Sequence, residues 1–183
     1  MGLIGPACNP IGAMKKASVL VMLVTFGCVG SRASGGEQDV FKWISSHVQT
    51  VSYIVTTPLA TYQEDQSATV EFSGCTAKVT EDLKTPKSDI RTTTSFDLRT
   101  LEPDMIRSSS ERGVLDTHVS EYFTLQLPLA SPAKSVTTVR TSHGSKTDMS
   151  ASNSVSLVLP DGDMADRQAN AWRDASRACS ARE

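Results

Sequence analysis

Ala-Thr-Val-Glu-Phe-Ser-Gly-Cys-Thr-Ala-Lys-Val, residues 68–79, is the stretch that decides the predicted fold. Apolar and polar residues alternate on both sides of Ser73-Gly74, which is typical of a β-hairpin with a two-residue loop. Such a hairpin places three apolar pairs opposite each other: Phe72 with Cys75, Val70 with Ala77, and Ala68 with Val79. All six side chains then share one face. The pattern therefore predicts an antiparallel sheet with Cys75 on its core side.

More strands are expected after this hairpin. The clearest is at residues 90–99, where Ile90, Thr92, Thr94, Phe96 and Leu98 alternate with polar residues. Shorter or weaker patterns predict strands at residues 105–110, 119–132, 136–141 and 155–159. The polar stretches 59–66 and 143–153 are expected to be loops, and Glu111-Arg112-Gly113 a turn. Together these signals predict an α+β fold with an antiparallel sheet or open barrel of about six to seven strands.

One amphipathic helix is expected before the strands in the chain, and another after them. Residues 39–51 carry apolar side chains at helical spacing, with Asp39 as the N-cap. A second helix is expected after Asp163, its N-cap, and would cap the sheet. The face that this helix would turn towards the sheet carries Ala165, Ala169, Trp172, Ala175, Ser176 and Cys179. Since Trp43 and Trp172 both lie on apolar helix faces, they are expected to pack in the core.

The four cysteines of the chain are Cys8, Cys28, Cys75 and Cys179. Removal of an N-terminal segment, or a lipid on Cys28, would leave Cys75 and Cys179 as a pair. In an oxidising compartment an even pair predicts a disulfide, here closing a loop of about 100 residues. The alternative is two buried free thiols.

The N-terminal residues 1–33 resemble an export signal. Lys15-Lys16 precedes an uncharged, mostly apolar stretch at residues 17–30, which is the arrangement of a secretory signal peptide. The true start of the chain is then expected at Met14. Residues 34–38 are expected to be a linker, and residues 39–183 a single α+β domain.

Two kinds of processing fit this segment. Small residues at Ser31 and Ala33 favour signal cleavage after Ala33, which would release the protein. Val24-Thr25-Phe26-Gly27-Cys28 loosely matches a bacterial lipoprotein signal, in which Cys28 would carry the lipid and anchor the protein. An uncleaved anchor is a third alternative. Residues 1–33 hold three basic residues and no acidic ones, so their loss would leave 15 basic against 20 acidic residues and a net charge of −5. This balance argues against a nucleic-acid partner.

No known catalytic, metal or cofactor motif stands out. His47, His118 and His143 lack metal-ligand neighbours at the usual spacing, and Ser131-Pro132-Ala133-Lys134 lacks the partner motifs of penicillin-binding enzymes. Asp161, Asp163 and Asp166 are expected to stabilise a helix start. Glu64-Asp65 and Glu81-Asp82, which could be imagined as a glycosidase pair, are expected to be solvated turn charges.

The strands from Ala68 to Leu159, followed by a helix with Trp172 at its middle, resemble pleckstrin-homology-like domains. The resemblance implies a binding scaffold but no ligand. The N-terminal helix around Trp43 departs from that pattern, and the Ser73-Gly74 turn is too short and uncharged to act as that family's phosphoinositide loop. The export signal and the terminal helix with Cys179 also look like small bacterial envelope proteins.

The sequence thus predicts a non-enzymatic domain, periplasmic, extracellular or lipid-anchored at the cell envelope, that binds an envelope protein or polymer without a cofactor. A small extracytoplasmic hydrolase or hydrolase inhibitor is the alternative, which predicts convergent polar groups with perturbed ionisation.

Overall fold

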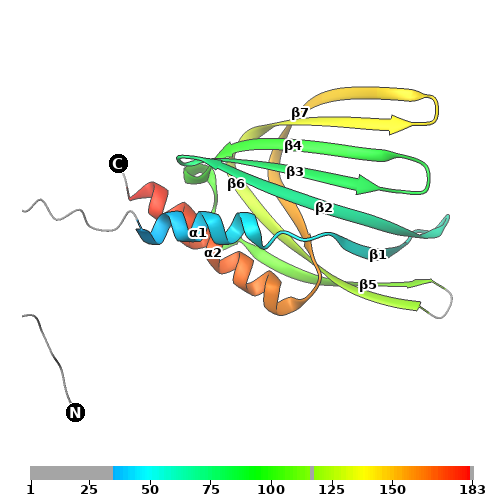
Figure 1. Cartoon of the computed structure of the whole chain (residues 1–183), viewed down its shortest axis with the longest axis horizontal. Coiled ribbons are helices and arrows are strands. Elements are labelled where there is room, and N and C mark those ends of the chain that lie inside the picture. Colours follow the sequence, from blue (N-terminus) through cyan, green and yellow to red (C-terminus); the bar gives the residue numbers. More distant parts are fainter. Residues whose placement is uncertain (1–34, 116–117, 182–183) are drawn as a thin grey trace, which may run out of the picture. The chain divides into compact units, whose positions relative to one another are not determined.

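A computed structural model describes residues 35–115 and 118–181, which form an antiparallel sheet with one helix before it and one after it (Figure 1). The elements in chain order are α1 (Gly35–Ser46), β1 (Val51–Thr56), β2 (Thr61–Ser73), β3 (Thr76–Lys84), β4 (Asp89–Asp97), the 3-10 helices η1 (Leu98–Thr100) and η2 (Pro103–Met105), β5 (Arg107–Leu115), β6 (His118–Thr141), β7 (Gly144–Leu159) and α2 (Gly162–Ser180). The predicted α+β architecture is confirmed, with both helices and seven strands.

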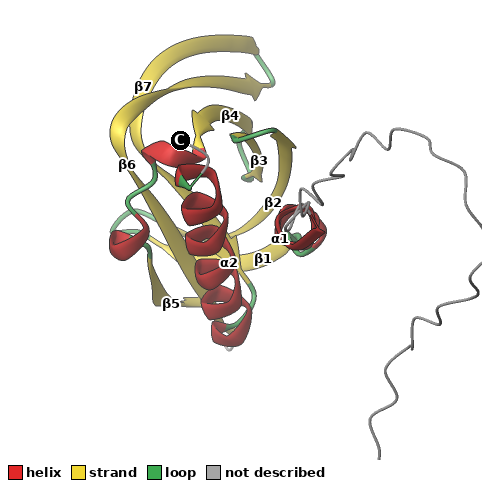
Figure 2. Ribbon diagram, turned by 90° about the vertical axis from the view of Figure 1, so that its left-hand side faces the viewer, coloured by secondary structure: helices red, strands yellow, loops and turns green. Residues whose placement is uncertain are grey.

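The seven strands form one curled sheet. Their order is β1-β2-β3-β4-β6-β5, and β7 pairs with β6 outside this path. Strand β6 pairs with three other strands: β5 along its first half, β4 along its second half, and β7 along most of its length. The curl brings β1 towards β5 and β6: the Ile54 amide donates to Ser120 Oγ (2.8 Å), and the Thr56 hydroxyl donates to the Val114 carbonyl (3.3 Å). The result is a half-barrel (Figure 2).

The hairpin predicted at residues 68–79 is confirmed, but its register is two residues from the expected one. Phe72 pairs with Ala77 and Val70 pairs with Val79, because Gly74 and Cys75 form the loop. Gly74 has a φ of +58°, a conformation that glycine adopts without steric cost, and it is the first loop residue. A shift of two residues preserves the side-chain alternation, so the apolar residues still share one face.

We call this face of the sheet, with Val70, Val79 and Phe96, the inner face, and the opposite one the outer face. Strand β4 follows the predicted alternation and ends at Asp97, two residues early, because Asp97 accepts a hydrogen bond from the Arg99 amide and caps η1. Leu98 is therefore in a 3-10 helix instead of a strand, although it is fully buried.

Helix α2 closes one end of the half-barrel, the end at which the β2–β3 turn lies (Figures 1 and 2). Trp172 on α2 is completely buried, and its ring centroid lies 5.7 Å from that of Phe72 and 6.1 Å from that of Phe96. The predicted core face of α2 is confirmed, because all of its residues are buried: Ala165, Ala169, Trp172, Ala175, Ser176 and Cys179.

Both helices begin earlier than predicted. The N-cap of α2 is Asp161 instead of Asp163: it has an extended backbone, and its side chain accepts a hydrogen bond from the Met164 amide at 2.7 Å. Asp163 lies in the first turn, where its charge favours the helix dipole. Helix α1 begins at Gly35 instead of Asp39, so most of the expected linker is helical.

The sequence prediction also missed strands with little apolar alternation. Helix α1 ends at Ser46, and β1 begins at Val51, the last residue of the expected helix. The first part of β2 lies where a loop was expected. Glu111-Arg112-Gly113 belongs to β5 instead of a turn, and the predicted polar loop at residues 143–153 forms most of the exposed half of β7. These segments are strands because neighbouring backbones pair with them, and only some of their side chains are buried.

Strand β6 replaces two shorter strands that were expected to be separate. It runs through both prolines at 128 and 132. The register with β7 shifts between Pro128 and Ala133, and this irregularity accommodates residues that cannot complete a regular ladder. The Pro128 carbonyl accepts a hydrogen bond from the Glu102 amide at 3.0 Å, so the irregular segment is still held to the chain beside it.

Closure of the half-barrel depends on Gly113 in β5. A Cβ atom at this position would overlap the backbone carbonyl of Ile54 in β1, which cannot move as a side-chain end could. Gly113→Ala is therefore expected to lower the free energy of unfolding by several kcal/mol, because overpacking forces the backbone apart. Gly36→Ala is the control, since nothing lies within 4 Å of its Cβ position in α1.

Urea denaturation of both variants tests this expectation. The Gly36 variant should be as stable as the wild type or slightly more stable, because alanine favours a helix. Equal unfolding free energies for the Gly113 variant and the wild type would contradict the close approach of β1 and β5.

Candidate functional site: a charged groove on the outer face

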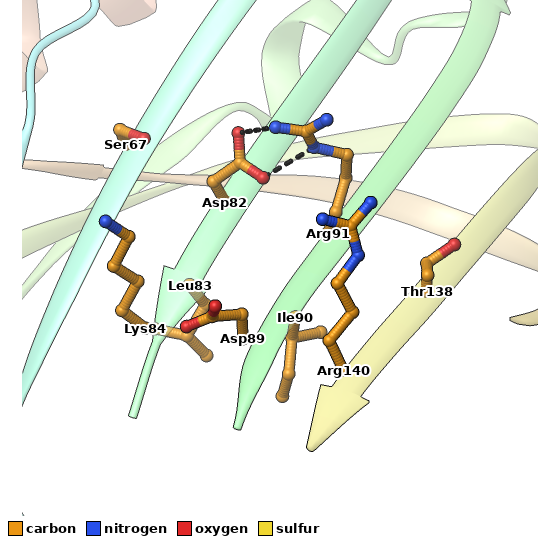
Figure 3. A pocket seen from close by; sticks show the side chains of 9 residues that line it. All are labelled: Ser67, Asp82, Leu83, Lys84, Asp89, Ile90, Arg91, Thr138 and Arg140. Atoms are coloured by element: carbon orange, nitrogen blue, oxygen red, sulfur yellow. Dashed lines mark hydrogen bonds and ion pairs between the residues drawn. The ribbon is translucent and has the colours of Figure 1, made fainter. Parts of the chain in front are cut away.

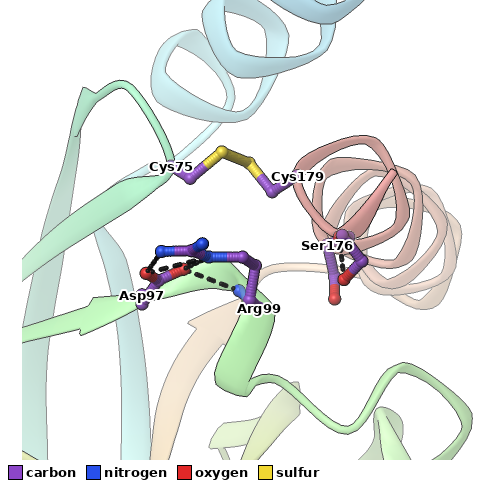
Figure 4. The surroundings of a disulfide bond; sticks show 6 residues. Cys75, Asp97, Arg99, Ser176 and Cys179 are labelled. Carbon is purple, nitrogen blue, oxygen red and sulfur yellow. Dashed lines mark hydrogen bonds and ion pairs between the residues drawn. A yellow bond between two sulfur atoms is a disulfide. The ribbon is translucent and has the colours of Figure 1, made fainter. Parts of the chain in front are cut away.

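The predicted cysteine pair is joined in the structure. Cys75 in the β2–β3 turn and Cys179 in the last turn of α2 form a disulfide across 104 residues, with their Cα atoms 5.7 Å apart (Figure 4). The prediction of this bond is confirmed. Cys28, the candidate lipidation site, and the cleavage site after Ala33 lie outside the described residues.

The disulfide joins three parts of the fold at the closed end of the half-barrel. The Cys75 carbonyl accepts a hydrogen bond from the Leu98 amide at 2.8 Å, which attaches the turn to η1. Beside it, Arg99 Nε donates to both carboxylate oxygens of Asp97, at 3.0 and 3.1 Å (Figure 4). Hydrogen bonds from Arg99 lower the pKa of Asp97. Because its neighbours hold the turn and η1 together, we interpret the disulfide as a structural crosslink.

The two adjacent acid pairs do not lie in turns, and their interpretation as solvated turn charges is wrong. Glu64-Asp65 lies within β2 and Glu81-Asp82 within β3. Successive side chains of a strand point to opposite faces, so each pair is divided between the two faces of the sheet. Glu64 and Glu81 are on the inner face, and Asp65 and Asp82 are on the outer face.

On the outer face, charged side chains from β3, β4 and β6 surround a hollow of about 350 Å³ (Figure 3). The strand register explains the arrangement, because Lys84 pairs with Asp89, and Asp89 pairs with Arg140. One pleat further along, Asp82 pairs with Arg91. Cross-strand neighbours on one face lie close enough to interact, so residues far apart in the sequence form one charged surface.

Arg91 is held in place by Asp82. Its Nε and Nη2 atoms donate to the two carboxylate oxygens of Asp82 at 2.6 and 2.9 Å (Figure 3). This two-pronged hydrogen bonding raises the pKa of Arg91 above its ordinary value. Arg140 lines the same hollow, but the ion pairs of the described residues do not include it. The hollow thus holds one guanidinium group that is fixed in an ion pair, and one whose cross-strand neighbour is Asp89 but which no ion pair of the described residues includes.

A second hollow, of about 730 Å³, continues the first one at the β3–β4 and β6–β7 hairpin loops. Both are lined by Asp89 and Arg140, so they form one surface that we call the outer groove. Lys87 and His143 line the second hollow. Charged residues at alternate positions of 82–91 were the only sequence signal for this groove, and that signal required the register to be known.

On the inner face, polar side chains form a hydrogen-bonded chain. The Tyr53 hydroxyl donates to Gln66 Oε1 at 3.0 Å, and Gln66 Nε2 donates to Glu81 Oε1 at 3.0 Å. Burial raises the pKa of Glu81 to about 7, although the hydrogen bond from Gln66 opposes this shift. Burial and the neighbouring Glu64 also raise the pKa of Tyr53, whose ring lies 4.3 Å from that of Tyr122. These hydrogen bonds bring together convergent polar groups, of which the sequence pointed only to Glu81, and not to Tyr53 or Gln66.

The tryptophans and histidines considered in the sequence do not line the outer groove, apart from His143. Trp172 lies in the core as predicted, whereas Trp43 is half-buried with the Arg167 guanidinium 5.3 Å from its ring. His118 and His143 are exposed, and His47 stacks on Trp43. Among the described residues, no three His, Cys, Asp or Glu side chains are grouped as metal ligands.

No protein-family model, curated protein or solved structure matches this chain.

Neither α1 nor α2, the α-helices of the described part of the chain, has an apolar stretch long enough to cross a membrane.

The disulfide is expected to contribute substantially to stability. A crosslink across 104 residues contributes about 4–5 kcal/mol at most in the chain-entropy model. Cys75→Ser/Cys179→Ser should lower the free energy of unfolding by up to that amount in urea denaturation. Reductant should destabilise the wild type by a similar amount and leave the double variant unchanged. If reductant does not change the wild type, the bond does not support the fold.

Stability is also expected to depend on the protonation of Glu81. Its pKa is raised from 4.5 to about 7 in the folded protein. The favourable contribution of the protonated form is complete below about pH 4.5 and disappears as the pH rises through about 7. The free energy of unfolding should therefore fall by about 1–3 kcal/mol between pH 5 and 8.

Glu81→Gln should remove most of this fall, because glutamine does not titrate. Glu121→Gln, at an exposed position in β6, is the control and should keep the wild-type pH dependence, including any contribution from the histidines. Parallel slopes for wild type and Glu81→Gln in urea denaturation would show that Glu81 titrates as an exposed carboxylate.

Proposed function

We propose that this protein is a non-catalytic binding module that works outside the cytoplasm. The Cys75–Cys179 disulfide is the observation that carries the proposed location, because such bonds persist in oxidising compartments and are rare in the cytosol. The signal-like sequence at residues 1–33 supports the same location independently.

Two forms of the mature protein fit the proposal. Cleavage after Ala33 would release a soluble periplasmic or extracellular protein. A lipid on Cys28 would instead tether the domain to the membrane, through the residues that precede α1. Either form would present the outer groove to components of the cell envelope.

The outer groove supports a binding function. It is lined by charged and hydroxyl-bearing side chains of several strands, which the sheet register holds at fixed spacing. Such a surface can recognise a polar partner by complementary charges and hydrogen bonds. We propose an envelope protein or polymer as the partner, bound without a cofactor.

The pleckstrin-homology-like resemblance is part of this proposal. A curled antiparallel sheet whose end is closed by α2, with Trp172 buried at the middle of the helix, supports it. Helix α1 departs from the pattern, and the short turn at Gly74 lacks basic residues. The likeness therefore concerns the scaffold and gives no phosphoinositide site.

The inner-face carboxyl group favours a second candidate function, a small extracytoplasmic hydrolase or hydrolase inhibitor. A carboxyl group with a pKa near 7 is suited to general acid–base catalysis, and Glu81 belongs to a chain of polar groups with Gln66 and Tyr53. Hydrolysis of peptides, esters or peptidoglycan that is lost in Glu81→Gln and kept in Glu121→Gln would establish the enzyme and overturn the non-catalytic proposal.

The intact mass of the mature protein from its own cells tests the proposed location. A mass matching residues 34–183 is expected for the released form, and a chain beginning at Cys28 with added acyl mass for the tethered form. Reduction should add about two mass units if the Cys75–Cys179 bond is present in the cell. A full-length, unmodified chain with free thiols would contradict the proposal.

A further inference from the structure

We propose that the outer groove binds an acidic polysaccharide, in which sugar units carry carboxylate or sulfate groups. This inference rests on the proposed function as a binding module and adds the chemical class of its partner. The charge of the groove, its shape and its mixture of hydrogen-bond donors and acceptors all favour such a partner.

The groove carries more basic than acidic side chains. It is lined by the basic residues Lys84, Lys87, Arg91 and Arg140 and by the acidic residues Asp82 and Asp89. Asp82 neutralises Arg91, whereas the ion pairs of the described residues include none of the other three cations. Lys84 also has Asp65 on β2 as its cross-strand neighbour, so the four basic residues outnumber the three nearby carboxylates by one. The groove is therefore slightly positive on a chain with a net charge of −2, which favours an anionic partner.

The groove is long and open. Its two hollows, of about 350 and 730 Å³, share Asp89 and Arg140 and together extend from β2 to the β6–β7 loop. This space is far larger than a single inorganic anion needs. A chain with repeated anionic groups can contact Lys84, Arg140 and Lys87 at the same time, and its binding is strengthened by each.

The lining of the groove also carries many hydrogen-bonding groups. Besides the cations, it includes the hydroxyl groups of Ser67, Thr85, Ser88, Thr138, Thr141 and Ser142. The carboxylate of Asp89, at the junction of the two hollows, would repel a simple anion but accepts hydrogen bonds from sugar hydroxyls. Cations for the acidic groups and an acceptor for the hydroxyls together match a polysaccharide better than a bare polyanion.

The groove walls are also held in place before any ligand binds. Thr85 Oγ1 accepts hydrogen bonds from the Lys87 and Ser88 amides at 3.2 and 3.0 Å, which fixes the β3–β4 loop. Thr141 Oγ1 accepts one from the His143 amide at 3.2 Å and fixes the β6–β7 loop. Ordering costs on binding are therefore reduced. Among the described residues, no Phe, Tyr or Trp side chain lines either hollow, so charge must supply most of the affinity.

Calorimetric titration of the full mature domain at low salt tests the inference, with polygalacturonate as the carboxylate probe, heparin as the sulfate probe and dextran as the neutral control. Binding to either charged polymer but not to dextran is expected, and it should weaken as salt is added. The tighter of the two polymers identifies the acidic group. No binding to either charged polymer, or equal binding to dextran, would overturn the inference.

Matched substitutions locate the site. Lys84→Gln and Arg140→Gln should each weaken binding about fivefold to tenfold, as expected for the loss of one charged contact. Lys134→Gln and Arg112→Gln remove exposed charges outside the groove and should change binding less than about twofold. Equal losses in all four variants would mean that attraction is unspecific, and would overturn the site.

A comparison of Asp89→Ala with Asp89→Asn distinguishes recognition of a polysaccharide from attraction of a simple polyanion. Both variants remove the negative charge, but only Asp89→Ala removes the hydrogen-bond acceptor. If Asp89 accepts sugar hydroxyls, Asp89→Ala should bind the polymer more weakly than Asp89→Asn, whereas equal binding by the two variants would overturn the sugar recognition. The mass of the mature protein does not depend on the groove. If the chain is processed as expected but binds neither polymer, this inference is overturned and the proposed function is not.

Discussion

The burial of Trp172 is the interaction on which the rest of the structure depends. A curled sheet with polar side chains on much of both faces has few places to bury apolar area, and α2 provides the largest of them. The indole ring meets Phe72 from β2 and Phe96 from β4, so a single side chain joins strands that are separated in the order of the sheet. Burying a ring of this size contributes several kcal/mol, a large share of the stability of a small domain.

The disulfide and α1 strengthen the same end of the half-barrel. Cys75 fixes the end of α2 to the β2–β3 turn, and Gln168 Nε2 on α2 donates to the His47 carbonyl just after α1 at 3.3 Å. The opposite end carries the β1–β2, β3–β4 and β6–β7 hairpin loops (Figure 1). Because stability is concentrated at the closed end, the strands at the other end can carry polar and charged side chains. The outer groove and the inner-face carboxyl group both use this freedom.

The sequence predicted the elements that bury apolar side chains. Alternation at residues 68–79 and 90–99 and the apolar face of α2 predicted the central hairpin, β4, the capping helix and the Cys75–Cys179 pair. The exposed half of β7 could not be predicted, since it carries no apolar alternation. It is a strand because the backbone of β6 pairs with it. Glu64 and Glu81 were expected in turns. Only the pairing of β2 with β3 shows that both side chains lie on the inner face of the sheet. The groove could not be predicted, because Arg140 meets Asp89 through a register that depends on the whole sheet.

Helix α2 and the sheet are expected to form one cooperative unit held by Trp172 and the disulfide. Native-state hydrogen exchange of the oxidised protein tests this cooperativity. The slowest amides of α2 and those of β3, β4 and the central part of β6 should exchange with the same free energy of opening. If α2 instead exchanges orders of magnitude faster than these strands, the sheet is stable without its helix, and the two do not form one unit.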